Sequence, residues 1–202
     1  MIIKNESELK TLRECGKRLG SILQELSRAV RPGVSTGFLD DLATRLITEV
    51  GGDAVFKGYR AYGSRGAYPA TVCVSVNEEI VHGIPKKERI LQEGDIVGLD
   101  IGMRYPSKTG LITDTALTVA VGRISDDAKK LMKGTEEALR CGIGAAKAGG
   151  KIGDIGHAIE TRLKKYTLSI IRDLVGHGVG KKLHEDPYIP NYGKPDTGLL
   201  LK

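Results

Sequence analysis

The pattern of apolar positions along the chain predicts a pair of helices at the N-terminus. Leucine, isoleucine and valine recur at helical spacing over residues 5–30, and "RPG" at 31–33 ends that helix. Asn5, followed three residues later by a glutamate, is typical of a capping box at its start. A second helix is predicted over about 35–50, and the glycines at 51–52 end it.

Three apolar, β-branched runs follow and predict strands. They are "ATVCVSV" (70–76), "DIVGLDI" (95–101) and "ITDTALTVAV" (112–121). The sequence "RYPSKTG" (104–110) has the composition of a turn, so the last two strands are expected to form a hairpin.

The order of elements then starts again. Ser125 opens a helical stretch that "AGG" at 148–150 ends, and a shorter helix follows around residues 155–163. "LSIIRDLV" (168–175) is predicted as the next strand. Adding 116 to the residue number superposes the two halves, with Gly33 on Gly149 and Gly37 on Gly153. The sequence therefore predicts an internal duplication and an α+β fold, with helices on a curved antiparallel sheet.

The two predicted halves differ in length. The first runs over about 1–122 and the second over about 123–202, so by the repeat about 40 residues of C-terminal strand are missing. The chain is therefore expected to be truncated at its C-terminus.

Composition narrows the class of protein. A chain of 202 residues with 40% hydrophobic and 28% charged residues is typical of a globular protein. No long apolar run opens the chain, so neither a signal peptide nor a membrane span is expected. Three widely spaced cysteines indicate reduced thiols in the cytoplasm. The net charge of +6 could favour ribosomal RNA, although a solvated surface is the preferred interpretation. The low aromatic content argues against a base-stacking platform, and no specific DNA partner is expected.

Two aspartates and a histidine are candidates for metal binding. Asp100 and Asp114 lie in consecutive predicted strands among apolar residues, where a carboxylate is costly unless it is paired or coordinated. From spacing alone, metal binding and an Asp–Arg pair or exposed hairpin weigh about equally. His177, in "VGHGVGKKLHEDP" (175–187), shifts the balance, because carboxylates with an imidazole suit Mn, Fe, Co or Zn.

Three motifs carry a resemblance to a known family. "SVNEEIVHGIP" (75–85), "DIG" with a following "DTALT", and "VGHGVGKKLHEDPYIPNYG" closely resemble the type I methionine aminopeptidases, which are pita-bread metallopeptidases. "FKGYRAYGSRGAYPATVCVSVNEE" (56–79) extends the match, which runs from the first helix to the final lysine. The resemblance implies one catalytic domain over residues 1–202, with the pita-bread fold of two pseudo-symmetric halves.

The resemblance also implies roles for five residues. Asp100, Asp114 and His177 would bind two divalent metal ions (Co, Mn, Fe or Zn), with Asp114 bridging both and His177 on the second. The ions would lower the pKa of a bound water, whose hydroxide attacks the carbonyl after an N-terminal methionine. His184 would donate a hydrogen bond to that carbonyl or to the oxyanion. His82 would contact the scissile amide nitrogen.

A methionine pocket follows from the same resemblance. Its wall would include Phe56, Tyr59, Tyr68, Cys73 and Leu183, each of which taken alone is more often plain core. His157 matches no catalytic position and is expected on a helix surface. The implied activity is removal of the initiator methionine from nascent polypeptides by a cytoplasmic monomer, and association with the ribosome is left open.

Two departures from the family pattern bear on these expectations. Asp100 and Asp114 are further apart than in the usual pattern, which predicts a hairpin lengthened around "YPSKT", and a slip of register would turn one aspartate away. The family also takes two glutamate ligands from its last strands, beyond Lys202, and Glu185 matches neither. Activity of the 202 residues is therefore left open. The alternatives are a non-catalytic pita-bread module that binds the ribosome or a protein partner, and a prolidase-like hydrolase.

Overall fold

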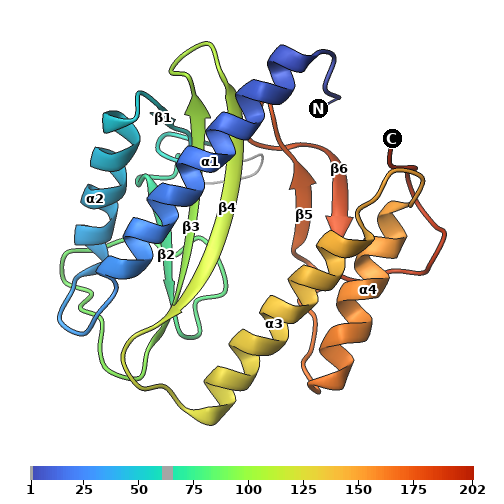
Figure 1. The fold of residues 1–202 in the computed structure, drawn as a ribbon. Coiled ribbons are helices and arrows are strands. Elements are labelled where there is room, and N and C mark those ends of the chain that lie inside the picture. Colours follow the sequence, from blue (N-terminus) through green and yellow to red (C-terminus); the bar gives the residue numbers. More distant parts are fainter. Residues whose placement is uncertain (1, 61–65) are drawn as a thin grey trace. The chain divides into compact units, whose positions relative to one another are not determined.

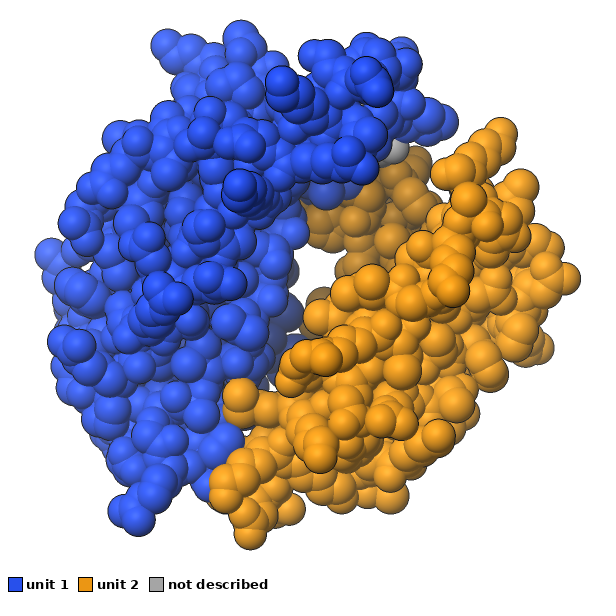
Figure 2. Space-filling view, viewed as in Figure 1, with its two compact units in different colours: residues 1–124, 179–183 blue, residues 125–178, 184–202 orange. Residues whose placement is uncertain are grey.

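The chain divides into two compact units, which Figure 2 colours separately. The computed structural model describes residues 2–60 and 66–202, so residues 61–65 of the family-like stretch 56–79 lie outside the described part. Unit 1 comprises Met1–Ile124 with Val179–Leu183, and unit 2 comprises Ser125–Gly178 with His184–Lys202. Among the described residues, no helix has the length and apolar character needed to cross a membrane.

Unit 1 begins with the two predicted helices, α1 (Glu6–Ala29) and α2 (Thr36–Glu49). Asn5 caps α1, because its side-chain oxygen accepts a hydrogen bond from the Glu8 amide at 2.9 Å. The Glu8 carboxylate accepts from the Lys4 amide at 2.8 Å, one residue before the position that a capping box predicts. Two hydrogen bonds between side chains and backbone amides thus stabilise the start of α1.

The helices of unit 1 pack on a four-stranded antiparallel sheet (Figure 1). Its strands are β1 (Asp53–Ala54), β2 (Val72–Val76), β3 (Ile96–Tyr105) and β4 (Leu111–Ala120). The strand β3 is central: β4 pairs along one side, and β2 and β1 pair along the other. The three predicted strands are confirmed, and β3 continues four residues further than predicted.

Alternation along β3 separates the core of unit 1 from the opposite sheet face. Successive side chains point to opposite faces of a strand, and every second residue of β3 is fully buried in the core beneath α1 and α2: Val97, Leu99, Ile101 and Met103. Burial of each such side chain is worth roughly 1.5–3 kcal/mol. The intervening Gly98, Asp100 and Gly102 therefore lie on the other face of the sheet.

Unit 2 contains a second helix pair and a hairpin. Its elements are α3 (Asp126–Ala145), α4 (Ile152–Lys165), β5 (Val175–Gly178) and β6 (Glu185–Pro190). Glu137 of α3 joins the helices, since its carboxylate accepts hydrogen bonds from the Arg162 guanidinium at 2.9 Å and the Tyr166 hydroxyl at 2.7 Å.

The predicted strand over 168–175 is wrong. Residues 168–174 form turns and irregular structure, and β5 begins only at Val175. The Leu168 side chain instead approaches Gly134 of α3, and the Leu168 amide closes the end of α4 by donating to the Leu163 carbonyl at 3.2 Å. Leu168 therefore packs on a helix, whereas Ile171 and Val175 are exposed, and periodicity does not distinguish such a run from a short strand.

One hydrogen-bond pattern occurs in each unit, and its glycine donors are related by the predicted offset of 116, whereas their acceptors are 110 residues apart. In unit 1 the Gly33 amide donates to the Leu91 carbonyl at 2.9 Å, and in unit 2 the Gly149 amide donates to the Leu201 carbonyl at the same distance. Both glycines have positive φ, 87° and 85°. An isolated bridge adjoins each pair, Ser35 with Ile90 and Lys151 with Leu200. The internal duplication is thus seen in matched hydrogen bonds.

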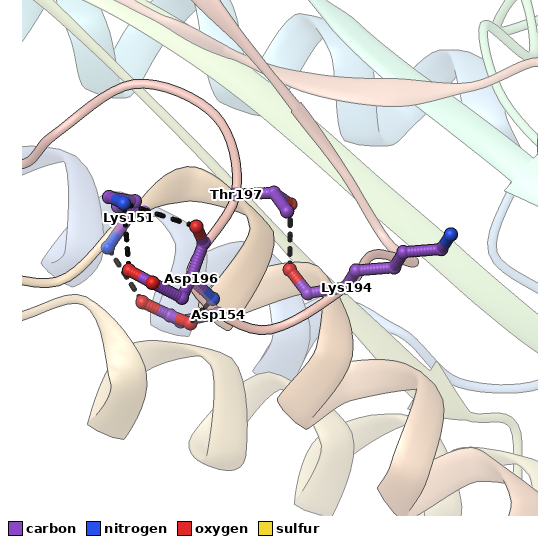
Figure 3. A network of polar contacts seen from close by, with 5 residues as sticks. All are labelled: Lys151, Asp154, Lys194, Asp196 and Thr197. Atoms are coloured by element: carbon purple, nitrogen blue, oxygen red, sulfur yellow. Dashed lines mark hydrogen bonds and ion pairs between the residues drawn. The ribbon is translucent and has the colours of Figure 1, made fainter.

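The repeat differs in how the second helix of each pair is capped. Ser35 caps α2, whereas Lys151 at the corresponding position has no acceptor in its side chain. Figure 3 shows the polar network found there: Asp154 accepts from the amides of Lys151 and Asp196, both at 2.7 Å. The Lys151 ammonium in turn pairs with the Asp196 carboxylate at 2.7 Å. The segment around Asp196 is thereby held against the start of α4.

Candidate functional site

Asp100 and Asp114 are diagonal neighbours on one face of the sheet of unit 1. Asp100 of β3 lies opposite Ala116 of β4, and Asp114 lies opposite Gly102, so both carboxylates project from the same face. The pairing continues without a slip to the hairpin turn, the segment that the resemblance predicts to be lengthened. The lengthened hairpin therefore keeps the two aspartates together.

The electrostatics of this pair suit a cation. Burial, the neighbouring Asp100 charge and a hydrogen bond between the two carboxyl groups raise the pKa of Asp114 to about 7. Two adjacent carboxylates repel each other when both are ionised, and a divalent cation with a preference for oxygen ligands removes that repulsion. The donor set thus fits a divalent metal ion.

The described part of the chain holds no group of three or more His, Cys, Asp or Glu side chains arranged to bind a metal ion. The two aspartates belong to unit 1, and His177 belongs to unit 2. The assignment of His177 as a third ligand stays a prediction.

His177 and His184 lie together in the hairpin of unit 2. Their ring centroids are 4.2 Å apart with the planes tilted by 41°, and the strand pairing is irregular next to His177. The His177 Nδ1 lies 3.0 Å from the Gly178 carbonyl oxygen. Because a carbonyl only accepts, Nδ1 carries the proton, and in the neutral ring Nε2 carries the lone pair that a metal requires.

All five residues predicted for the pocket gather in unit 1, on the sheet face opposite the helices. Buried Phe56, Cys73 and Leu183 form one apolar cluster, and Tyr59 and Tyr68 pack against it. The rings of Phe56 and Tyr68 meet edge to face, with centroids 6.5 Å apart.

The same cluster contains Ile112, for which the sequence predicted no role. Ile112 lies two residues before Asp114 on β4, so strand alternation places both side chains on one face. This spacing of two residues from Asp114 would have predicted from the sequence that Ile112 lies on the same sheet face.

Burial keeps the polar atoms of the pocket neutral. It raises the pKa of the Cys73 thiol to about 12, and the charges of Asp100 and Asp114 add to this effect. Burial also raises the pKa of Tyr68, whose hydroxyl donates to the Gly83 carbonyl at 2.9 Å. The cluster of Phe56, Cys73, Ile112 and Leu183 with Tyr59 and Tyr68 therefore contains a thiol and a phenol without charge.

The remaining two histidines lie on exposed surface. His82 lies in the loop after β2 with a φ of 58°. His157 is exposed on α4, as predicted, with Nε2 3.5 Å from the Thr161 hydroxyl.

Comparison with known proteins identifies the family. The model of metallopeptidase family M24 matches residues 10–202. The chain is 43% identical over 201 residues to a methionine aminopeptidase of Clostridium acetobutylicum and 46% identical over 202 residues to methionine aminopeptidase 1 of Bacillus subtilis. Each match covers 100% of this chain and 77% of the relative. The chain therefore belongs to metallopeptidase family M24, which implies a divalent metal cofactor.

Its place within that family is with the methionine aminopeptidases. The crystal structure of methionine aminopeptidase from Thermotoga maritima superposes with a TM-score of 0.92 at 40% identity, covering 100% of this chain and 78% of that one. The predicted pita-bread α+β fold is confirmed by this likeness. Prolidases and an Xaa-Pro dipeptidase match at 19–24% identity, which shows the fold alone.

Proposed function

We propose that this protein removes the N-terminal methionine from polypeptides by metal-assisted hydrolysis of the peptide bond that follows it. One observation carries the proposal. Cys73 of the apolar cluster lies directly opposite Asp100 in the sheet of unit 1, so the pocket and the aspartate pair share one sheet face. A methionine side chain in that pocket would place its carbonyl near the carboxylates.

Two divalent ions, of Co, Mn, Fe or Zn, are the proposed cofactors. Asp100 and Asp114 would hold them, with Asp114 bridging, because their carboxyl groups are adjacent and half-buried. His177 would serve as a further ligand through Nε2, because its Nδ1 donates to Gly178. When bound, the ions would act as Lewis acids and lower the pKa of a water.

The other assigned residues would act on the substrate. His82 would contact the scissile amide nitrogen, and His184 would donate to the carbonyl oxygen as negative charge develops there. Phe56, Tyr59 and Tyr68 would pack on the methionine thioether, since sulfur makes favourable contacts with aromatic rings. Cys73 and Leu183 would complete the apolar wall.

The proposal extends to the cellular setting. All three cysteines are free, which agrees with a reducing cytoplasm. We propose that residues 1–202 belong to one catalytic domain and that the protein acts as a monomer on nascent chains, with its net charge of +6 available for ribosomal RNA.

Release of methionine from a Met-Ala-Ser peptide tests the proposal. The protein is stripped with EDTA, reloaded separately with Co²⁺, Mn²⁺, Fe²⁺ or Zn²⁺, and free methionine is measured. We expect release only after reloading, and none from Leu-Ala-Ser. Release that EDTA leaves unchanged would contradict the proposal.

Four variants assign the roles. Asp114→Asn and His177→Ala should lose bound metal, measured by elemental analysis, together with activity. His82→Ala should keep its metal and lose about 100-fold or more in kcat, because a positioned proton-transfer group typically contributes factors of about 10²–10⁴. His157→Ala is the matched control and should leave both unchanged, since that side chain is exposed on α4. Loss of metal in His82→Ala would overturn its assignment to the substrate.

A further inference from the structure

The loop that carries His82 folds back along the free side of β2. The Val76 amide donates to the Glu79 carboxylate at 2.9 Å, and the Val74 amide donates to the Gly83 carbonyl at 2.9 Å. The side of β2 that does not pair with β3 is thereby covered by residues of the "SVNEEIVHGIP" motif. Part of the motif therefore has a structural role, because its hydrogen bonds hold the loop after β2 against that strand.

Gly83 is the point at which this loop is anchored most firmly. Its amide donates to the Ser75 hydroxyl at 3.1 Å, and its carbonyl oxygen accepts from the Tyr68 hydroxyl and the Val74 amide, both at 2.9 Å. A Cβ atom at this position would lie 2.7 Å from the Ser75 Cα and would also meet the Val74 carbonyl. Only glycine allows so close an approach between the two backbones.

Ser75 is suited to this role by its place in the sheet. Ser75 is one of three buried polar residues in the described chain. It lies opposite Gly98 of β3, and because glycine has no side chain, there is room for the Ser75 hydroxyl. Strand alternation puts the Ser75 side chain on the face that also carries Cys73. The anchor of the loop therefore shares a sheet face with the proposed pocket and the aspartate opposite it.

His82 precedes this anchored glycine and has an unfavourable backbone conformation. Its φ of 58° lies in the left-handed region, where residues other than glycine are uncommon and persist only when neighbouring contacts hold them. The three hydrogen bonds of Gly83 fix the peptide that follows His82. They therefore set the direction in which the exposed imidazole leaves the backbone.

We infer that Ser75 is a positioning residue for His82, acting through the Gly83 amide. This rests on the proposed function, because it gives the proposed substrate contact a fixed orientation. Without the Ser75 hydroxyl, the buried Gly83 amide would lose its acceptor, and the loop would relax away from the left-handed conformation at His82.

A double-mutant cycle in methionine release tests this inference. Ser75→Ala should lower kcat about tenfold while His82 is present, because small displacements of a reacting group are costly. In a His82→Ala background the same change should lower kcat less than about twofold, since the group being positioned is gone. Ser75→Thr, which keeps the hydroxyl, should restore activity. Ser21→Ala, at an exposed serine of α1, is the control for loss of a hydroxyl. Metal content should be equal in all variants.

Equal losses in both backgrounds, or no loss in either, would overturn the inference. Failure of the proposed function is distinguishable, because wild-type protein would then release no methionine. In that case the NMR chemical shift of the His82 Cε1–H proton tests whether Ser75 orients His82, and this measurement does not require enzymatic activity. The His82 signal, identified by its loss in His82→Ala, should shift in Ser75→Ala and stay in place in Ser75→Thr and Ser21→Ala. An unshifted signal in Ser75→Ala would equally reject the role of Ser75.

Discussion

Asp114→Asn is expected to stabilise the metal-free protein at neutral and alkaline pH. Burial first, and then the charge of Asp100, raise the pKa of Asp114 from an ordinary value of 3.8 to about 7. This difference corresponds to about 4 kcal/mol of stability lost once the carboxyl ionises in the folded state. Asparagine has nearly the same shape but no charge, so it avoids this cost.

The sign of the pH dependence follows from proton binding. The folded protein binds the Asp114 proton more tightly than the unfolded chain does, so wild-type stability falls as pH rises from about 4 to about 7. Asp114→Asn lacks this dependence. The variant should therefore be close to wild type below pH 4 and about 2–4 kcal/mol more stable at pH 8, allowing for the bonds that asparagine makes less well.

Urea denaturation in EDTA, followed by circular dichroism between pH 4 and pH 8, measures this difference. Asp41→Asn, at an exposed carboxylate of α2, is the matched control and should show a much smaller change. Saturating Mn²⁺ should offset most of this difference, because a ligand at 100 times its Kd stabilises the folded state that binds it by about 2.7 kcal/mol and the variant has lost a binding group. A less stable Asp114→Asn in EDTA at pH 8, or a difference independent of pH, would refute the reasoning.

Three further predictions test the packing. Exposed Cys141 should react with a thiol reagent at pH 8 far faster than Cys73, whose buried thiol has a pKa of about 12; equal rates in a mass-spectrometric time course would contradict its burial. Ser35→Ala should lower the free energy of unfolding by about 1 kcal/mol through loss of the α2 cap, as measured in urea, and an unchanged midpoint would show that the cap contributes nothing. Gly102→Ala should cost about 1–3 kcal/mol in the same assay, because the added methyl would lie 2.8 Å from the Phe56 ring; a neutral result would mean that the ring moves freely.

The helices, the main strands and the duplication could be predicted from the sequence because each leaves a local signal. The apolar spacing of α1 and α2, the caps at Asn5 and Ser35, and the alternation in β3 all arise from contacts within a few residues. The repeat offset of 116 was visible for the same reason, since Gly33 and Gly149 both occupy a turn with positive φ. The family motifs added expected roles for individual residues, which stay predictions.

Tertiary structure decided what local patterns leave open. The run 168–174 forms no strand: Leu168 packs near Gly134 of α3 and Ile171 is exposed, and the hydrophobicity of a short run does not name its partner. The aspartate pair depends on the register of β3 with β4, because a slip of one residue would turn one carboxylate to the other face of the sheet. Ile112 and Leu183 meet in one cluster although they are far apart in the sequence, and Ser75 holds Gly83 across a reversal of the chain. Each of these contacts joins residues that are distant in the sequence. No local sequence pattern records such a contact, because the two residues meet only after the backbone has folded.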